Sequence, residues 1–195
     1  MIRLASERDA AAIQRIYAPF VLQTAVSFET AAPGVDEMRS RVVATLARLP
    51  WLVCERQDEV IGYAYASPHR ARAAYGWSVD VTVYVHEDHR RNGVGRALYA
   101  SLLQVLRLQG FYNAYAGVTL PNPGSVGLHE AMGFRPVGIY RDVGHKLGQW
   151  HDVGWWQLAL QAHAAAPAAP ATLDAVVGGA AWDAAVQSGL AFLRG

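Results

Sequence analysis

Residues 77–109 constrain the fold of this chain more than any other stretch, because a strand pattern changes into a helix pattern across a basic glycine loop. Over 77–85, valines alternate with other side chains, and this alternation, rich in β-branched residues, predicts a strand. Over 97–109, apolar residues recur at helical spacing, and Gly110 ends the run. The segment Arg90-Arg-Asn-Gly-Val-Gly-Arg96 joins the two. This order of elements predicts an α/β fold.

The joining loop has the composition of an anion-binding site. Its two glycines lack the Cβ atom that would keep a ligand from the backbone, so successive N–H groups can point at an anion. The helix N-terminus adds partial positive charge, and three arginines add full charges. The loop is therefore a candidate diphosphate site, and its candidate binding residues are Arg90, Arg91, Asn92, Gly93, Val94, Gly95 and Arg96.

Two common diphosphate loops do not match this pattern. A P-loop requires Gly-Lys-Ser/Thr after the glycines, where this chain has Arg96-Ala97. A dinucleotide loop requires a third glycine at the position of Leu98. The remaining pattern, Arg90-x-x-Gly93-x-Gly95, resembles the coenzyme A loop of the GNAT superfamily of N-acetyltransferases.

A second motif supports this resemblance. The run Asn122-Pro-Gly-Ser125-Val-Gly-Leu128-His129, followed by Gly133-Phe134, resembles the family's Asn-x-x-Ser-x-x-Leu-Tyr-x-x-x-Gly-Phe, with a histidine in place of the tyrosine. In the family this motif opens the helix that covers the pantetheine side of the cofactor. The resemblance implies that Asn122 and Ser125 bind the cofactor, although an asparagine that only caps the helix would look the same.

Three further segments narrow the resemblance to the phosphinothricin acetyltransferase branch: Tyr75-Gly-Trp77, Thr82-Val-Tyr-Val85 and Gly148-Gln-Trp-His151-Asp-Val-Gly154. That branch N-acetylates phosphinothricin, methionine sulfoximine or methionine sulfone with acetyl-CoA as donor. The resemblance, which runs from Ile2 to Leu160, implies a mixed sheet of about six to seven strands flanked by about four helices, and a homodimer. It also implies resistance to such antibiotics or herbicides.

Acetyl transfer requires a neutral amine, and the resemblance offers Asp80 as the base, directly or through water. The family has a glutamate there, so this carboxylate is one methylene shorter. His129 can share that role or return a proton to the thiolate. Both residues also have ordinary alternatives. Asp80 could be a strand acid that points at solvent or at an arginine, and His129 could be a histidine on the surface of a helix. Backbone N–H groups of Val83, Tyr84 and Val85 are expected to polarise the carbonyl and pair with pantetheine.

An amino-acid substrate carries acidic oxygens, so cationic and hydroxyl groups are expected around it. Candidates for these contacts are Arg72, Tyr75 and Lys146, with Phe28 and Trp77 as walls. The seven histidines (His69, His86, His89, His129, His145, His151 and His163) have no compact ligand spacing, so we predict no metal.

Composition excludes several partners. A net charge of +1 with 17% charged residues gives no electrostatic footprint for nucleic acid. No apolar run reaches the roughly 18 residues that a membrane span requires. Residues 1–6 lack the apolar core of a signal peptide, and a single cysteine, Cys54, fits a reducing compartment, so we expect a cytoplasmic protein.

The periodicity also predicts the remaining elements. Strands are expected at 2–4, 51–56, 60–67, 111–119, 134–143 and 152–161, and helices at 10–20, 36–49 with Asp36 as the cap, and 124–132. A domain over 1–162 is followed by an Ala/Pro-rich linker from 163 and a possible helix over 173–193, interrupted by Gly178-Gly179. We interpret this tail as accessory, packed on a partner or mobile, without a catalytic group.

Two alternative functions fit the same residues. An enzyme of the same fold could acetylate another amine, such as a polyamine, an aminoglycoside or a protein N-terminus. A non-catalytic acyl-CoA-binding module would also carry the loop, with the Asp80 change marking lost activity.

Overall fold

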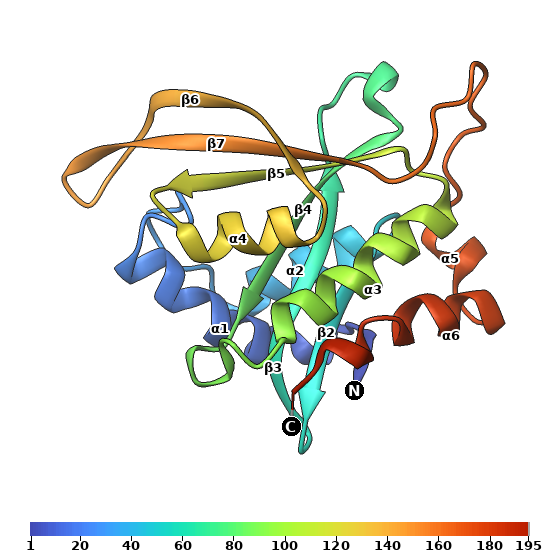
Figure 1. Ribbon diagram of the computed structural model, residues 1–195. Helices are drawn as coiled ribbons and strands as arrows, with labels where there is room; N and C mark the ends of the chain where they lie inside the picture. The colour runs from blue at the N-terminus through green and yellow to red at the C-terminus, as the bar shows by residue number, and fades with distance from the viewer. Residues whose placement is uncertain (195) are drawn as a thin grey trace.

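The structure, a computed structural model, describes residues 1–194 and is built on one seven-stranded sheet (Figure 1). The strand order is β1-β2-β3-β4-β5-β7-β6, and neighbours run antiparallel except for β4 and β5. The predicted α/β class with a mixed sheet is confirmed. The strands are β1 (Ile2–Leu4), β2 (Trp51–Arg56), β3 (Glu59–Pro68), β4 (Ser78–Val85), β5 (Asn113–Leu120), β6 (Arg135–Lys146) and β7 (Gln149–Ala159). The helices are α1 (Ala10–Gln23), α2 (Val35–Leu46), α3 (Val94–Gln109), α4 (Pro123–Ala131), α5 (Leu173–Val176) and α6 (Ala180–Gln187).

Helices cover both faces of the sheet. The helix α3 packs over one face, where Leu98 and Leu102 are fully buried, and α1 and α2 cover the other (Figure 1). Close approach of α3 requires a glycine in β3, because a Cβ atom on Gly62 would lie 2.9 Å from the Val94 side chain. Cross-strand partners share a face, so Asp80, paired with Ser67, points to the side of α1 and α2.

The strands β4 and β5 pair over a short distance only. Parallel pairing joins Ser78–Asp80 to Asn113–Tyr115, and no further β4–β5 pairs occur among residues 1–194. Figure 1 shows β4 and β5 running apart beyond this point. The segment Val81–Val85 therefore pairs with β3 and keeps its other edge open toward β5.

Several element boundaries differ from expectation, and two of these differences have a clear local cause. The cap of α2 is Gly34, and Asp36 lies within the first turn, so the prediction that Asp36 caps this helix is wrong. Its carboxylate still favours the positive end of the helix. The β6–β7 hairpin extends further than predicted, because Leu147 and Gly148 both adopt positive φ (52° and 80°) and close a tight two-residue turn.

The C-terminal tail packs on the same chain. Leu173, Trp182 and Val186 are buried in the core cluster that lies beneath α3. The Ser101 hydroxyl on α3 donates to the Val186 carbonyl at 2.6 Å, which fixes α6 beside α3 (Figure 1). Within residues 1–194, no helix has the length and apolar character needed to cross a membrane.

Candidate active site

Asp80 lies where β4 and β5 part, as the last residue of β4 that pairs with β5. Its carboxylate accepts a hydrogen bond from His69 Nδ1 at 2.6 Å. Burial raises the pKa of the Asp80 carboxyl, and the hydrogen bond from His69 opposes this change. A carboxylate with a raised pKa in contact with an imidazole is a suitable pair for accepting a proton.

Aromatic rings hold the His69 imidazole in place. Tyr115 stacks on it with ring centroids 4.3 Å apart, and Tyr75 and Trp155 contact its edges at 5.9 and 6.2 Å. The sequence did not single out His69 or Tyr115. One signal could have found His69. If strands 60–67 and 77–85 are neighbours and antiparallel, the residues that follow the first strand lie beside the residues that begin the second, and these include His69 and Asp80.

His129 lies between α3 and α4, 3% exposed. Its Nδ1 atom donates to the Ser125 carbonyl at 2.7 Å, and its Nε2 atom lies 2.9 Å from the Tyr99 hydroxyl. Burial lowers the pKa of this histidine, so the neutral ring is favoured. The contact with Tyr99 joins α4 to α3, and the role of His129 as a proton donor or base stays a prediction.

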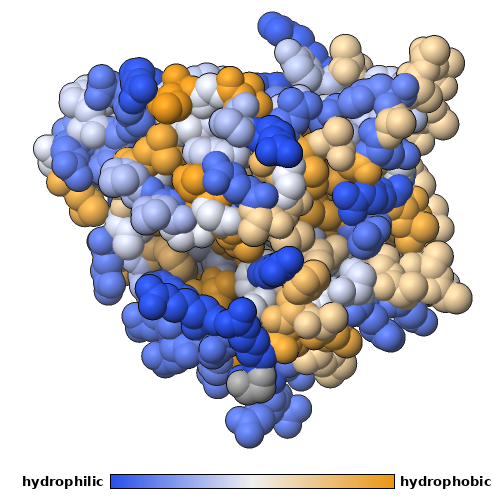
Figure 2. Space-filling view, viewed as in Figure 1, coloured by the Kyte–Doolittle hydropathy of each residue, from blue (hydrophilic) through white to orange (hydrophobic). Residues whose placement is uncertain are grey.

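The glycine loop has the backbone shape expected of an anion site. Arg91 and Gly93 both adopt positive φ (64° and 80°), and Gly93 directly precedes the first turn of α3. The Arg90 guanidinium lies 5.2 Å from the centre of the Phe20 ring. Figure 2 shows a strongly hydrophilic band of side chains over the loop that precedes α3.

Asn122 caps α4. Its side-chain oxygen accepts from the Ser125 backbone N–H at 3.1 Å, which confirms the capping interpretation. The Ser125 hydroxyl lies 3.4 Å from His129 Nδ1. Cofactor binding by Asn122 and Ser125 stays a prediction.

The predicted substrate residues lie in different places. Tyr75 reaches His69, and Arg72 is exposed before the same short turn. The Trp77 indole donates to the Ala168 carbonyl of the tail at 2.7 Å. Phe28 lies against Gly144 of β6, where a Cβ atom would overlap its ring.

Lys146 is 7% exposed, and its ammonium group donates at 2.6 Å to the carbonyls of Val21 and Ser27. Burial lowers the pKa of this ammonium group. These bonds tie the end of β6 to the end of α1 and the loop that follows it. Substrate contact by Lys146 stays a prediction.

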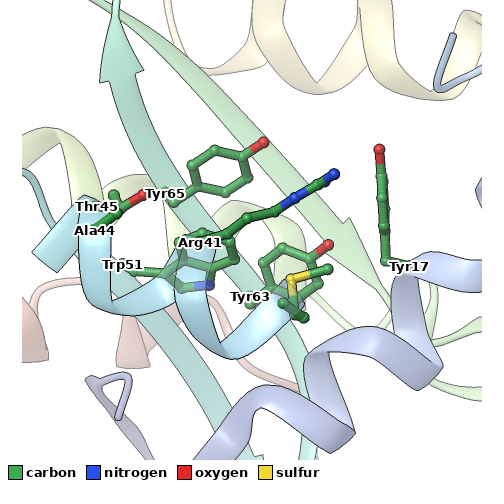
Figure 3. Close-up of a pocket in the computed structure, with 8 residues that line it drawn as sticks. Tyr17, Arg41, Ala44, Thr45, Trp51, Tyr63 and Tyr65 are labelled. Carbon is green, nitrogen blue, oxygen red and sulfur yellow. The ribbon is translucent and has the colours of Figure 1, made fainter. Parts of the chain in front are cut away.

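A cavity of about 310 Å³ opens on the face of the sheet that carries Asp80. Figure 3 shows the hydroxyls of Tyr17 and Tyr65 and the guanidinium of Arg41 pointing to the same side of it. Tyr65 pairs with Thr82 across β3 and β4, which places this cavity two residues along β4 from Asp80. Its lining residues are Tyr17, Met38, Arg41, Ala44, Thr45, Trp51, Tyr63 and Tyr65.

Comparison with known proteins defines the class of this chain. The model of the acetyltransferase (GNAT) domain matches residues 2–155. The chain therefore belongs to the GNAT acetyltransferases and is an N-acetyltransferase.

Particular relatives are similar over most of their length. A phosphinothricin N-acetyltransferase of Streptomyces viridochromogenes is 43% identical over 156 residues, which are 80% of this chain and 85% of that protein. An L-methionine sulfoximine/L-methionine sulfone acetyltransferase of Salmonella typhimurium is 35% identical, covering 84% of this chain and 96% of that one. A Salmonella typhimurium acetyltransferase solved with its cofactor acetyl-CoA superposes with a TM-score of 0.83 at 35% identity, covering 86% and 98% of the two chains.

Proposed function

We propose that this protein transfers the acetyl group of acetyl-CoA to the α-amine of a small amino-acid-like substrate of the phosphinothricin, methionine sulfoximine or methionine sulfone type. The relatives named for these substrates support the proposal. The observation that carries it is the arrangement along β4, which has the Asp80–His69 pair at one end of its open segment and the glycine loop beyond the other.

The loop and the open strand fit the two halves of coenzyme A. The N–H groups at the start of α3 and the arginines around them suit a diphosphate. The segment Val81–Val85 pairs with no strand on its β5 side among residues 1–194. Beyond the Val81 carbonyl, which accepts from the Tyr99 hydroxyl, its main chain can pair with an extended arm in the manner of an added strand. A rise of about 3.3 Å per residue gives roughly 16 Å from Asp80 to Val85, so an extended arm bound at the loop ends near Asp80.

The Asp80–His69 pair is the proposed proton acceptor. An ammonium group is not nucleophilic, so a base must take its proton before the nitrogen attacks the thioester carbonyl. The Asp80 carboxylate holds His69 Nδ1–H at 2.6 Å, which leaves Nε2 of the ring as the acceptor. Backbone N–H groups of 83–85 would polarise the carbonyl. His129, whose neutral Nε2 faces the Tyr99 hydroxyl, would take a proton that the attacking nitrogen loses and then return it through that hydroxyl to the leaving thiolate.

The substrate proposal is tested by the release of coenzyme A from acetyl-CoA with six amines in parallel. These are phosphinothricin, methionine sulfoximine, methionine sulfone, glutamate, spermidine and an aminoglycoside. Turnover on the first three alone supports the proposal. Turnover on spermidine or the aminoglycoside instead favours an acetyltransferase with another amine, and tight coenzyme A binding without turnover on a broad panel favours the binding module.

A homodimer is part of the proposal. The hairpin β6–β7 exposes Val137, Ile139, Tyr140, Val143 and Trp150, whose side chains are between 44% and 63% exposed. Exposed apolar side chains gathered on one hairpin favour a protein partner, and a second copy is the partner that the family resemblance implies.

Two further proposals follow from the activity and the composition. Acetylation removes the ammonium charge of an amino-acid antibiotic or herbicide, and we propose that a cell that expresses this enzyme resists such compounds. Cys54 is buried and free, which supports a reducing, cytoplasmic location.

A further inference from the structure

The end of the chain lies against the glycine loop. The backbone N–H of Arg194 donates to the Asn92 carbonyl at 3.0 Å. The Phe192 carbonyl lies so close to Gly93 that a Cβ atom there would overlap its oxygen. The Arg96 guanidinium lies over the Phe192 ring, 4.3 Å from its centre. Three contacts therefore join the tail to the loop proposed to bind the diphosphate.

This contact is anchored on the rigid part of the fold. Gly189 packs directly on α3, where a Cβ atom would overlap the Ala97 carbonyl oxygen. The Gly189 N–H donates to the Ser101 hydroxyl at 3.2 Å, and Ser101 is fully buried. On the far side, the Arg56 guanidinium of β2 donates to the Arg194 carbonyl at 2.5 Å. The segment 189–194 is thus held at both ends.

The tail contacts leave the anion-binding side of the loop available. On the loop, the contacts involve the carbonyl of Asn92, the Cα atom of Gly93 and the guanidinium of Arg96, which lies on the Phe192 ring. The first N–H groups of a helix have no partner within the helix, and those at the start of α3 are not used by these three tail contacts. The tail therefore supports the loop without filling it.

The loop needs such support because its conformation is unusual. Arg91 holds a positive φ of 64°, which a residue with a side chain adopts only when the surrounding structure enforces it. The tail fixes the next two residues from outside and holds the cation of Arg96 on an aromatic face. A binding loop that is already ordered loses less freedom when its ligand arrives.

We infer that the end of the C-terminal tail, residues 192–194, positions the coenzyme A loop, with Phe192 as a positioning residue for acetyl-CoA binding. The inference rests on the proposed use of this loop for the cosubstrate. The family model ends at residue 155, so this segment belongs to a part of the chain outside the matched domain.

The test measures the Kd of acetyl-CoA by calorimetry, together with both KM values and kcat, in the full-length Phe192→Ala and Phe192→Leu variants. Loss of the ring frees Arg96 and the loop, so the Kd and KM of acetyl-CoA should rise about 5- to 20-fold in both variants. The KM of the amine and kcat should stay within about twofold, since the ring lies at the diphosphate loop and not at Asp80. Phe192→Leu keeps apolar bulk and guards against a simple folding defect.

Leu190→Ala is the matched control. Leu190 belongs to the same short turn, is 38% exposed, and takes no part in the three loop contacts. Its acetyl-CoA affinity should equal that of the unmodified protein. A fall in melting temperature for Phe192→Leu with an unchanged Kd would overturn the inference. Tighter acetyl-CoA binding in this variant would also overturn it, because the tail would then compete with acetyl-CoA for the loop.

A second variant separates this inference from the proposed function. A Cβ atom on Gly95 would lie 3.3 Å from Leu128 and 3.7 Å from Val85, so Gly95→Val changes the loop from the side away from the tail. Weaker acetyl-CoA binding in Gly95→Val, with no change in either Phe192 variant, supports the role of the loop in cofactor binding and refutes the positioning role of the tail. Unchanged binding in all three variants refutes both roles.

Discussion

His69 and Asp80, which face each other across the start of the β3–β4 hairpin, form a hydrogen bond of 2.6 Å between Nδ1 and Oδ1. The family resemblance places a glutamate at position 80, and in this chain the shorter aspartate contacts the His69 imidazole. The Asp80 carboxylate orients the His69 ring through Nδ1, and the ring has a second nitrogen, Nε2, on its other side. We propose that this pair lets the shortened carboxylate serve as a proton acceptor through the ring.

Asp80→Asn is expected to lower kcat/KM by about 100-fold, because the amide cannot accept the proton and presents the wrong group to His69. The affinity for acetyl-CoA should stay unchanged. Burial raises the pKa of Asp80, so the protonated carboxyl group is favoured in the folded state. The stability that this group contributes is present below the pKa of the unfolded chain and is lost as the pH rises through the raised pKa. The variant should therefore be no less stable than the parent at neutral pH. Steady-state kinetics and calorimetry check both points, and full activity in the variant would place the base elsewhere.

His69→Gln is expected to lower kcat by about 10- to 100-fold while the KM of acetyl-CoA changes little. Glutamine keeps a donor for the Asp80 carboxylate but offers no nitrogen base. If Asp80 alone accepts the proton, this variant keeps most of its kcat and loses only the fixed position of the carboxylate. The comparison of kcat in the two single variants and the double variant decides between a pair and a lone acid.

The sequence predicted those features whose cause is local. The helix α3 and the β2–β3 hairpin follow from periodicity and turn residues, and Gly93 and Gly95 mark the candidate anion loop. The Asp80–His69 contact depends on how two strands register beside a third strand, β5, whose Tyr115 stacks on the imidazole. No pattern within one segment contains that information.

The tail shows the same limit at longer range. Its Ala/Pro-rich composition predicts a linker and an accessory tail, packed on a partner or mobile. Composition cannot report that Trp182 and Val186 pack in the core beneath α3 of the same chain. The contact between Phe192 and Arg96 joins residues that are far apart in the chain. Such docking depends on complementary surfaces that exist only after both partners have folded.

His129→Gln is expected to flatten the acid limb of the stability curve. Burial lowers the pKa of His129 below its usual value of about 6.5, so the neutral ring is favoured in the fold. Its contribution to stability is present above a pH of about 6.5 and is lost as the pH falls through the lowered pKa. Unfolding measured by urea at a pH of about 5.5 and of about 7.5 should show a smaller difference in the variant, and an equal difference would contradict this assignment.

Trp182→Ala is expected to lower the free energy of unfolding by about 3–5 kcal/mol, because it empties a large volume in the core shared by α6 and α3. Val177→Ala, at a site in the same tail that is 40% exposed, should change it by less than about 0.5 kcal/mol. Circular dichroism during urea unfolding provides the measurement. An equally small effect of both changes would show that the tail is not part of the cooperative unit.

Ile139→Glu is expected to convert a dimer to a monomer, because it puts a charge on the exposed apolar face of β6. Light scattering after size exclusion at micromolar concentration reports the mass. Val43→Glu is the matched control. Val43 is an exposed residue of α2, and the change should leave the mass unchanged. A monomeric parent protein would refute the dimer directly.

The early end of the β4–β5 pairing at Asp80 has a thermodynamic consequence. The two parts of the sheet, β1–β4 and β5–β7, are joined by three β4–β5 residue pairs. Main-chain pairing between the two parts is therefore weaker than pairing within either of them. A ligand that lies along the open edge adds binding energy to the folded state alone, and the stability then rises with ligand concentration. A larger supply of acetyl donor should therefore raise the stability of the folded enzyme as well as its rate.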